Sequence, residues 1–173
     1  MFIALQVVLF AAELTPWVQQ FFVVPWTNAL AAISAWLVTV IDPNVVASGK
    51  VIRSTANGFA VSIEAGCNGI EATIVLIAAI FAFPAPWRDR FLGLAAGIVA
   101  VQGLNIVRVI SLFYLGQWNM QVFEWAHLYV WQALIMLDVL VVWLVWVRLL
   151  PQDRRPGGGP GGPAAGTTAP VSA

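Results

Sequence analysis

The chain has 173 residues, of which 61% are hydrophobic and 9% charged, and its formal net charge is zero. Soluble domains are close to half apolar and a quarter charged, and so short a chain cannot bury this much apolar surface in a water-soluble globule. The composition therefore excludes a soluble protein, and the zero net charge indicates neither a nucleic-acid partner nor a polybasic lipid-binding patch.

Two apolar runs, Met1 to Leu14 and Phe21 to Ile41, occupy the N-terminal third of the chain. A helix needs about 20 apolar residues to cross a hydrocarbon core of about 30 Å, so the second run is long enough and the first is short. Two arrangements stay open. Either the second run crosses the membrane, or the first crosses alone and Asn28 to Ile41 lies along the outer interface.

The segment from Lys50 to Glu64 predicts a small β-hairpin outside the membrane. From Phe59 onward its apolar residues alternate with small or polar ones, and Asn57-Gly58 is a favoured two-residue turn.

Three further apolar runs are long enough to cross a membrane: roughly Gly66 to Phe83, Phe91 to Leu115 and Trp125 to Val147. Together with the N-terminal runs they predict an all-α polytopic membrane protein, a bundle of four to five transmembrane helices. Residues 1–150 are expected to form one membrane-embedded domain. Residues 151–173, rich in Gly and Pro, are expected to form a disordered cytoplasmic tail.

Arginine positions predict the orientation, because short loops rich in Lys and Arg stay in the cytoplasm. The loop from Pro84 to Arg90 carries two arginines, and the chain after the last span carries Arg148, Arg154 and Arg155. Both segments are predicted to be cytoplasmic. The hairpin and the segment from Gly116 to Glu124 are then expected to lie outside.

The only cysteine and the only histidine fall at the same predicted depth as one arginine. At 1.5 Å of rise per residue, Cys67 lies about 25 Å, Arg108 about 27 Å and His127 about 31 Å above the cytoplasmic boundary. Three separate helices are thus predicted to bring a thiol, a guanidinium and an imidazole to the outer side of the membrane.

These side chains permit nucleophilic catalysis. A thiolate attacks a carbonyl, a histidine accepts the thiol proton, and a fixed cation stabilises the developing oxyanion. A neighbouring cation and a helix N-terminus also lower the pKa of a thiol. Simpler roles remain open for each residue: Cys67 as a packing residue, Arg108 as a side chain reaching the interface, and His127 as an interfacial anchor.

Further polar residues lie inside the predicted spans. Gln102, Asn105 and Arg108 recur every third residue and form a polar stripe that should face the bundle interior. Glu71 lies one turn below Cys67, where it either pairs with Arg108 or forms a structural ion pair. The absence of CxxC, HExxH and Cys/His clusters predicts neither a metal nor another cofactor.

The stretch Gly66-Cys67-Asn68-Gly69-Ile70-Glu71 resembles the cysteine motif of the exosortase/archaeosortase family. Asn105-Ile106-Val107-Arg108 resembles the family's arginine motif, and His127 its histidine. The small size and the loop from Ala82 to Arg88 look most like the short subtype called exosortase H. The resemblance covers roughly Ile63 to Trp146, about half of the chain.

This resemblance implies a membrane-embedded cysteine transpeptidase of the bacterial cytoplasmic (inner) membrane, with its active site facing the periplasm or outside. Cys67 would be the nucleophile, Arg108 would stabilise the oxyanion or bind the substrate, and His127 would be the general acid/base. Supporting roles would fall to Asn68, Glu71 and Asn105.

The resemblance also implies the substrates: exported proteins that carry a C-terminal sorting signal made of a short motif, a transmembrane helix and a basic cluster. For exosortase H the motif would end near Trp-Gly. Enzymes of this kind cleave at the motif and are thought to transfer the new C-terminus to an acceptor.

Two other readings compete with this one. A non-catalytic membrane assembly factor or a small transporter subunit would use the polar stripe for packing or ligand passage and would tolerate Cys67→Ser. A membrane aspartic protease would need Asp42 and Asp138 to meet. The first is predicted in an outer loop and the second near mid-span, where helix packing is its expected role.

Overall fold

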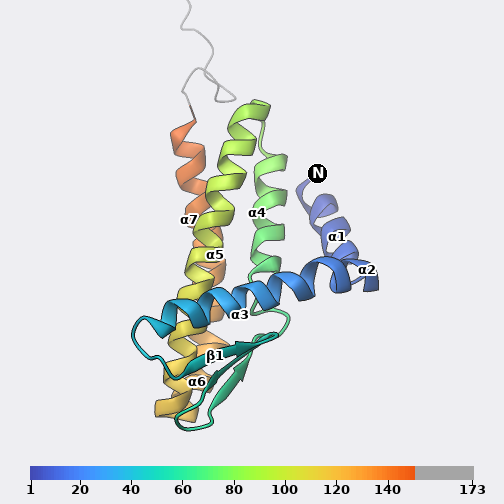
Figure 1. Cartoon of the computed structure of the whole chain (residues 1–173). Helices are drawn as coiled ribbons and strands as arrows, with labels where there is room; N and C mark the ends of the chain where they lie inside the picture. The colour runs from blue at the N-terminus through green and yellow to red at the C-terminus, as the bar shows by residue number, and fades with distance from the viewer. Residues whose placement is uncertain (151–173) are drawn as a thin grey trace, which may run out of the picture.

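Helices dominate the computed structural model, which describes residues 1–150, and a small sheet lies at one end of them (Figure 1). The helices are α1 (Phe2–Glu13), α2 (Pro16–Val18), the π-helix η1 (Gln19–Val23), α3 (Val24–Thr39), α4 (Ile70–Ala82), α5 (Trp87–Trp118), α6 (Met120–Trp125), the π-helix η2 (Ala126–Val130) and α7 (Trp131–Leu149). The strands are β1 (Val45–Ser48), β2 (Val51–Ser54) and β3 (Ala60–Ser62). The tail predicted at 151–173 lies outside the described residues.

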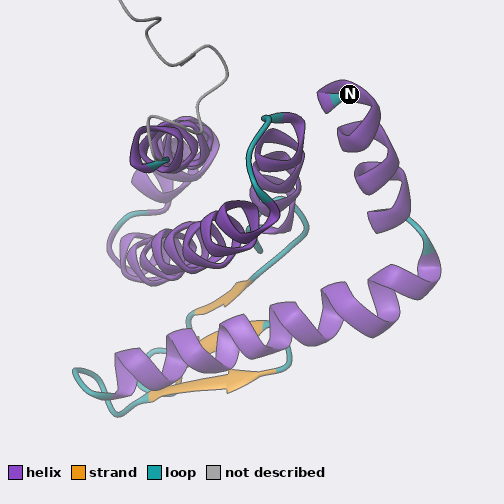
Figure 2. Ribbon diagram, turned by 90° about the horizontal axis from the view of Figure 1, so that it is seen from above, coloured by secondary structure: helices purple, strands orange, loops and turns teal. Residues whose placement is uncertain are grey.

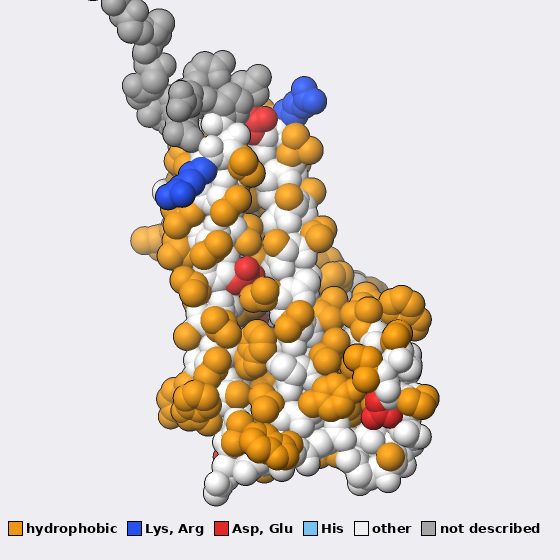
Figure 3. All heavy atoms as spheres, turned by 90° about the vertical axis from the view of Figure 1, so that its left-hand side faces the viewer, with side chains coloured by type: hydrophobic (Ala, Val, Ile, Leu, Met, Phe, Trp, Pro, Cys, Tyr) orange, Lys and Arg blue, Asp and Glu red, His pale blue; other side chains and the backbone are white. Residues whose placement is uncertain are grey.

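Three helical stretches are long and apolar enough to cross a membrane: Pro16–Thr39, Trp87–Trp118 and Met120–Leu149. Two shorter apolar helices, α1 and α4, accompany them. Large hydrophobic side chains are exposed along the helices, and hydrophobic side chains are spread over the whole length of the face seen in Figure 3. Exposed apolar surface of this extent is stable in lipid and not in water. The all-α polytopic membrane class is therefore confirmed.

The long helix α3 lies crosswise to the others. In Figures 1 and 2, α4, α5 and α7 run alongside one another, whereas α3 crosses them at the end where the sheet lies. Helix α1 packs beside α4. Length and composition alone allow Pro16–Thr39 to span a membrane, but a helix crosswise to α5 and α7 cannot span the same bilayer. The geometry favours the arrangement in which residues from Asn28 onward lie along the interface.

The predicted hairpin is present and forms part of a larger sheet. Strands β2 and β3 pair antiparallel, with Ile52 opposite Val61. Residues 55–59 connect them, so the predicted two-residue Asn57-Gly58 turn is wrong in length, although Gly58 has the φ of 76° that a tight turn needs. Strand β1 adds on the other side of β2, so the order is β1-β2-β3. Sequence analysis missed β1 because four residues without alternation give no strand signal. The sheet and α3 share a core with Val109 and Phe113 of α5.

Helix boundaries differ from the apolar runs. Helix α4 begins at Ile70 and not at Gly66, because Gly66 and Gly69 have φ of 84° and 73°, outside the helical region. Helix α5 and the stretch Met120–Leu149 are longer than predicted at their ends, since polar residues can extend a helix beyond its apolar span. The side chain of Asn119 caps the second stretch by accepting hydrogen bonds from two backbone N–H groups.

Glycines in α5 show how closely the bundle packs. A Cβ at Gly93 would overlap the indole of Trp146 on α7, whereas nothing lies within 4 Å of one at Gly103. Gly93→Ala should lower the free energy of unfolding by about 1–3 kcal/mol. Gly103→Ala, in the same helix, should raise it by about 0.5–1 kcal/mol. Thermal unfolding of the two variants in the same detergent should show a lower unfolding temperature for Gly93→Ala and a higher one for Gly103→Ala. Equal changes in unfolding temperature would contradict this packing.

Candidate active site

Cys67 lies in the loop that joins β3 to α4. Its N–H donates to the C=O of Glu64 (2.9 Å), and the glycines on either side of Cys67-Asn68 have left-handed backbones. The Oδ1 atom of Asn68 accepts a hydrogen bond from the N–H of Ile70 at the start of α4 (3.1 Å). This turn presents the thiol just before the N-terminus of α4, where the helix dipole favours an anion.

The thiol lies in contact with the imidazole of His127. The distance between Cys67 Sγ and His127 Nε2 is 3.0 Å, and both residues are half-buried. His127 belongs to η2, a π-helical insertion between α6 and α7. Such insertions add a residue to a turn and are common at functional sites. The ring of Phe123 lies beside the imidazole, with 5.7 Å between ring centroids.

The guanidinium of Arg108 completes the cluster. Its Nη2 lies 3.4 Å from Cys67 Sγ, and its Nη1 donates to the C=O of Gly66 (3.4 Å). Arg108 is 1% exposed, so the charge is held in a fixed position beside the thiol. The structure thus brings together the three residues that the sequence placed at one depth. The arrangement can transfer the thiol proton to a base and stabilise an oxyanion.

Burial raises the pKa of the Cys67 thiol above its ordinary value, and the charge of Arg108 opposes this shift only in part. The sequence suggested a lowered pKa, because the desolvation of a half-buried loop is invisible in a spacing argument. At neutral pH the thiol is therefore mostly protonated. Proton removal by His127 during attack fits this state better than a preformed thiolate does.

The pH dependence of thiol modification tests this. Because a raised pKa keeps the thiol neutral to higher pH, labelling of Cys67 by a membrane-impermeant thiosulfonate should have its midpoint above about 8.5, the ordinary thiol value. Arg108→Gln removes a charge that lowers this pKa, so the midpoint should move further up. Ser48→Cys, an exposed thiol in a Cys67→Ser background, gives the reference midpoint. A Cys67 midpoint below that reference would contradict the assignment.

Glu71 holds the loop and does not pair with Arg108. Its Oε1 accepts a hydrogen bond from the N–H of Gly66 (2.6 Å), and no ion pair joins it to Arg108 within residues 1–150. The carboxylate and the guanidinium therefore bind the two ends of the same residue, the N–H and the C=O of Gly66. Neither of the two alternatives predicted for Glu71, a pair with Arg108 or a structural ion pair, is seen within residues 1–150, and the two side chains connect only through the backbone of Gly66.

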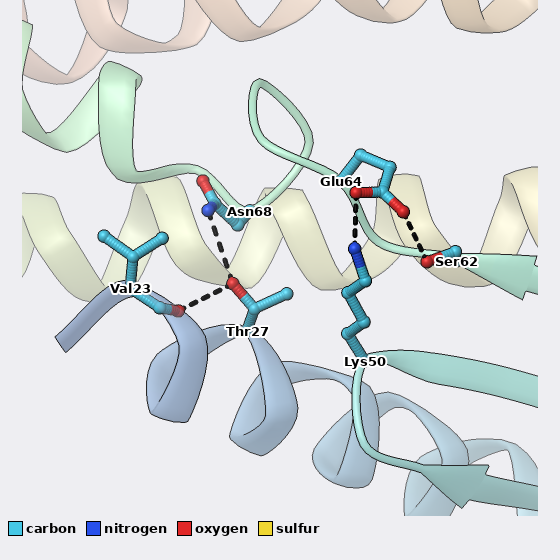
Figure 4. A network of polar contacts seen from close by, with 6 residues as sticks. All are labelled: Val23, Thr27, Lys50, Ser62, Glu64 and Asn68. Atoms are coloured by element: carbon cyan, nitrogen blue, oxygen red, sulfur yellow. Dashed lines mark hydrogen bonds and ion pairs between the residues drawn. The ribbon is translucent and has the colours of Figure 1, made fainter. Parts of the chain in front are cut away.

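Asn68 ties the loop to α3. Its Nδ2 donates to Thr27 Oγ1 (3.3 Å), and its C=O accepts a hydrogen bond from Trp26 Nε1 (3.3 Å). Figure 4 shows Thr27 between the amide of Asn68 and the C=O of Val23. Sequence analysis missed this wall of the site. The available signal was Thr27, a polar residue within the apolar run from Phe21 to Ile41. It made that run a less convincing membrane span, and it matched no known motif.

The polar stripe of α5 faces the interior, as predicted: Gln102, Asn105 and Arg108 are all buried. Gln102 Nε2 donates to the C=O of Gly69 and to Thr73 Oγ1, both at 3.2 Å. The side chain of Asn105 is fully buried and makes no hydrogen bond within the described residues.

The two aspartates of the competing protease reading share no hydrogen bond. Asp42 accepts hydrogen bonds from Asn44 in the loop after α3, and Asp138 Oδ2 is buried in α7 without a hydrogen-bond partner in residues 1–150. Within that part of the chain, no group of three His, Cys, Asp or Glu side chains could hold a metal ion.

One cavity, of about 450 Å³, lies between α5 and α7 and is lined by none of the three clustered residues. Its lining is apolar apart from Asp89, so it offers no group for the chemistry of the thiol. A smaller cavity, of about 140 Å³, adjoins the cysteine loop and is lined in part by Thr27, Lys50, Glu64 and Asn68.

A family model described as transmembrane exosortase matches residues 1–145, most of the chain. The match includes Cys67, Arg108 and His127 and extends to the N-terminal helices. No curated protein and no solved structure matched the chain.

Proposed function

This chain belongs to the transmembrane exosortase family, and we propose that it is a cysteine transpeptidase that cleaves C-terminal sorting signals of exported proteins. One observation carries the proposal. The imidazole of His127 and the buried guanidinium of Arg108, from two separate helical elements, lie 3.0 Å and 3.4 Å from Cys67 Sγ in the loop before α4. A packing cysteine has no need for both a base and a buried cation.

The reaction begins with acylation. The Sγ of Cys67 attacks the carbonyl carbon of the scissile peptide bond, and His127 takes the thiol proton. The negative charge that develops on the carbonyl oxygen is stabilised by Arg108, whose two terminal nitrogens lie at the loop. His127 then returns the proton to the leaving nitrogen as the C–N bond breaks. The products are a thioester on Cys67 and a free amine on the released segment.

The second half transfers the acyl group. An amine on an acceptor, or water, attacks the thioester carbon and loses a proton to His127, which gives it to the departing sulfur. Transfer to an amine forms a new amide bond, and transfer to water forms a carboxylate. Both outcomes regenerate the Cys67 thiol, and no metal or other cofactor takes part in this scheme.

The proposed setting is the cytoplasmic membrane of a bacterium, with the site on its outer face. One observation supports this orientation. The first turn of α5, which carries Arg88 and Arg90, lies at the end opposite the sheet, and short arginine-rich connections stay in the cytoplasm. The proposed substrate is an exported protein with a short motif, a transmembrane helix and a basic cluster. Among subtypes, we favour exosortase H, whose motif would end near Trp-Gly.

The test uses an exported reporter that ends in such a signal, with Trp-Gly or Pro-Glu-Pro motifs compared. We expect the wild-type chain to shorten the Trp-Gly reporter and to form a hydroxylamine-sensitive adduct on Cys67. Cys67→Ala should insert equally well and do neither. Processing by Cys67→Ala would overturn the cysteine mechanism and favour a non-catalytic assembly or transport role.

A further inference from the structure

Strand β3 is an edge strand with free backbone groups. It pairs with β2 on one side only, through hydrogen bonds that include Ser54 N–H to Phe59 C=O (2.8 Å) and Ile63 N–H to Lys50 C=O (3.0 Å). Successive residues of an antiparallel strand direct their backbone groups to opposite edges. Residues 59, 61 and 63 therefore face β2, while Ala60 and Ser62 direct their N–H and C=O to the unpaired edge. Both residues are exposed.

The proposed nucleophile, Cys67, lies in the loop that directly follows this edge strand. Four residues separate Ser62 from Cys67, and the intervening loop is fixed at both ends. Glu64 accepts hydrogen bonds from Ser62 Oγ (2.7 Å) and Lys50 Nζ (2.5 Å), as Figure 4 shows, and its C=O accepts one from Cys67 N–H. The position of the edge relative to the thiol is thus set by hydrogen bonds.

We propose that the free edge of β3 binds the extended segment of the substrate that precedes its membrane helix. This segment adds as a fourth strand, through the backbone groups of Ala60 and Ser62, and places the scissile carbonyl at Cys67. The inference rests on the proposed function and names how its substrate is held. Main-chain pairing recognises an extended backbone, so selection by side chains is left to other parts of the site.

A substrate peptide fits this edge better than a second copy of the chain. Only two residues face outward, and pairing two such strands buries far less than the roughly 1,200 Å² of a specific protein interface. A substrate whose helix lies in the same membrane is already at high effective concentration, so a few hydrogen bonds are enough to orient it.

Proline substitution on the two edges of the sheet tests the proposal. Ala60→Pro removes an outward N–H and blocks strand addition, yet an edge position facing solvent tolerates proline. The matched control is Ala47→Pro in β1. Thr55 N–H bonds Asn44 C=O, so by the same alternation Ala47 faces the opposite outer edge of the sheet, and it is also exposed.

We expect Ala60→Pro to slow processing of the Trp-Gly reporter at least about tenfold, the loss of roughly one strong hydrogen bond. Ala47→Pro should process it at the wild-type rate, and both should unfold at the same temperature. Equal processing by the two proline variants would overturn the edge inference and leave the proposed function standing. Failure of the wild-type chain to process the reporter would instead remove the proposed function, and this inference with it.

A binding measurement that needs no catalysis completes the test. Ala60→Cys in the Cys67→Ser chain is combined with reporters that carry one cysteine at successive positions before the helix. Strand pairing predicts disulfide formation at every second position, because alternate side chains share a face. Cross-linking at every position, or only between two copies of the chain, would overturn it.

Discussion

Replacing Arg108 by glutamine should reduce processing by about two to three orders of magnitude, the usual effect of removing an oxyanion-stabilising donor. The guanidinium is 1% exposed and touches both Cys67 Sγ and the C=O of Gly66. Glutamine removes the positive charge and cannot keep both contacts, so the oxyanion would form without its cation. The measurement is the rate of reporter shortening in membranes that contain equal amounts of each variant.

Two variants separate charge from geometry. Arg53→Gln makes the same chemical change at an exposed position of β2, and we expect the wild-type rate from it. Arg108→Lys keeps a positive charge but loses the fork that reaches two acceptors, so an intermediate rate is expected. If Arg108→Gln processed the reporter within about twofold of the wild-type rate, far from the loss expected for an oxyanion donor, the role assigned here would be wrong.

Gly69→Ala should be the most destabilising of the glycine substitutions outside the helices. Gly69 has a φ of 73°, which costs an alanine about 1–2 kcal/mol. A Cβ there would also lie 2.9 Å from both amide atoms of Gln102 and 3.1 Å from Asn105 Nδ2. Moving Gln102 breaks its hydrogen bonds to Gly69 and Thr73, for a total loss of about 2–5 kcal/mol.

Gly58→Ala is the matched control for this loss. Its φ of 76° imposes the same backbone strain, but nothing lies within 4 Å of the added Cβ. Thermal unfolding in detergent should therefore show a clearly larger decrease for Gly69→Ala. Reporter processing should also fall in that variant at permissive temperature, because the glycine lies between Cys67 and α4. Equal unfolding temperatures would show that the contact with the polar stripe is unimportant.

Several features of this protein follow from sequence alone because they depend on local properties. Apolarity and run length predict membrane helices, since each residue's transfer into lipid is nearly independent of its neighbours. The alternation after Phe59 and the Asn57-Gly58 turn predict the hairpin for a similar reason. The rise per residue of a helix predicts the depth in the membrane at which Cys67, Arg108 and His127 lie.

Other features were decided by tertiary structure. The helical stretch Pro16–Thr39 is long and apolar enough for a membrane span, yet its α3 part lies crosswise because one face packs on the sheet and on α5. Sequence spacing allowed Glu71 to pair with Arg108, but in the folded chain the carboxylate of Glu71 accepts a hydrogen bond from the backbone N–H of Gly66 instead.

The pKa of the Cys67 thiol also depends partly on the sequence and partly on the fold. The sequence supplies a cation that lowers the pKa of Cys67, and the fold supplies the burial that outweighs it. The sequence alone therefore determined which chemical groups are available and roughly how deep they lie. Only the tertiary structure decided which atoms touch and how much water they lose, because contacts and desolvation depend on all the packed elements together.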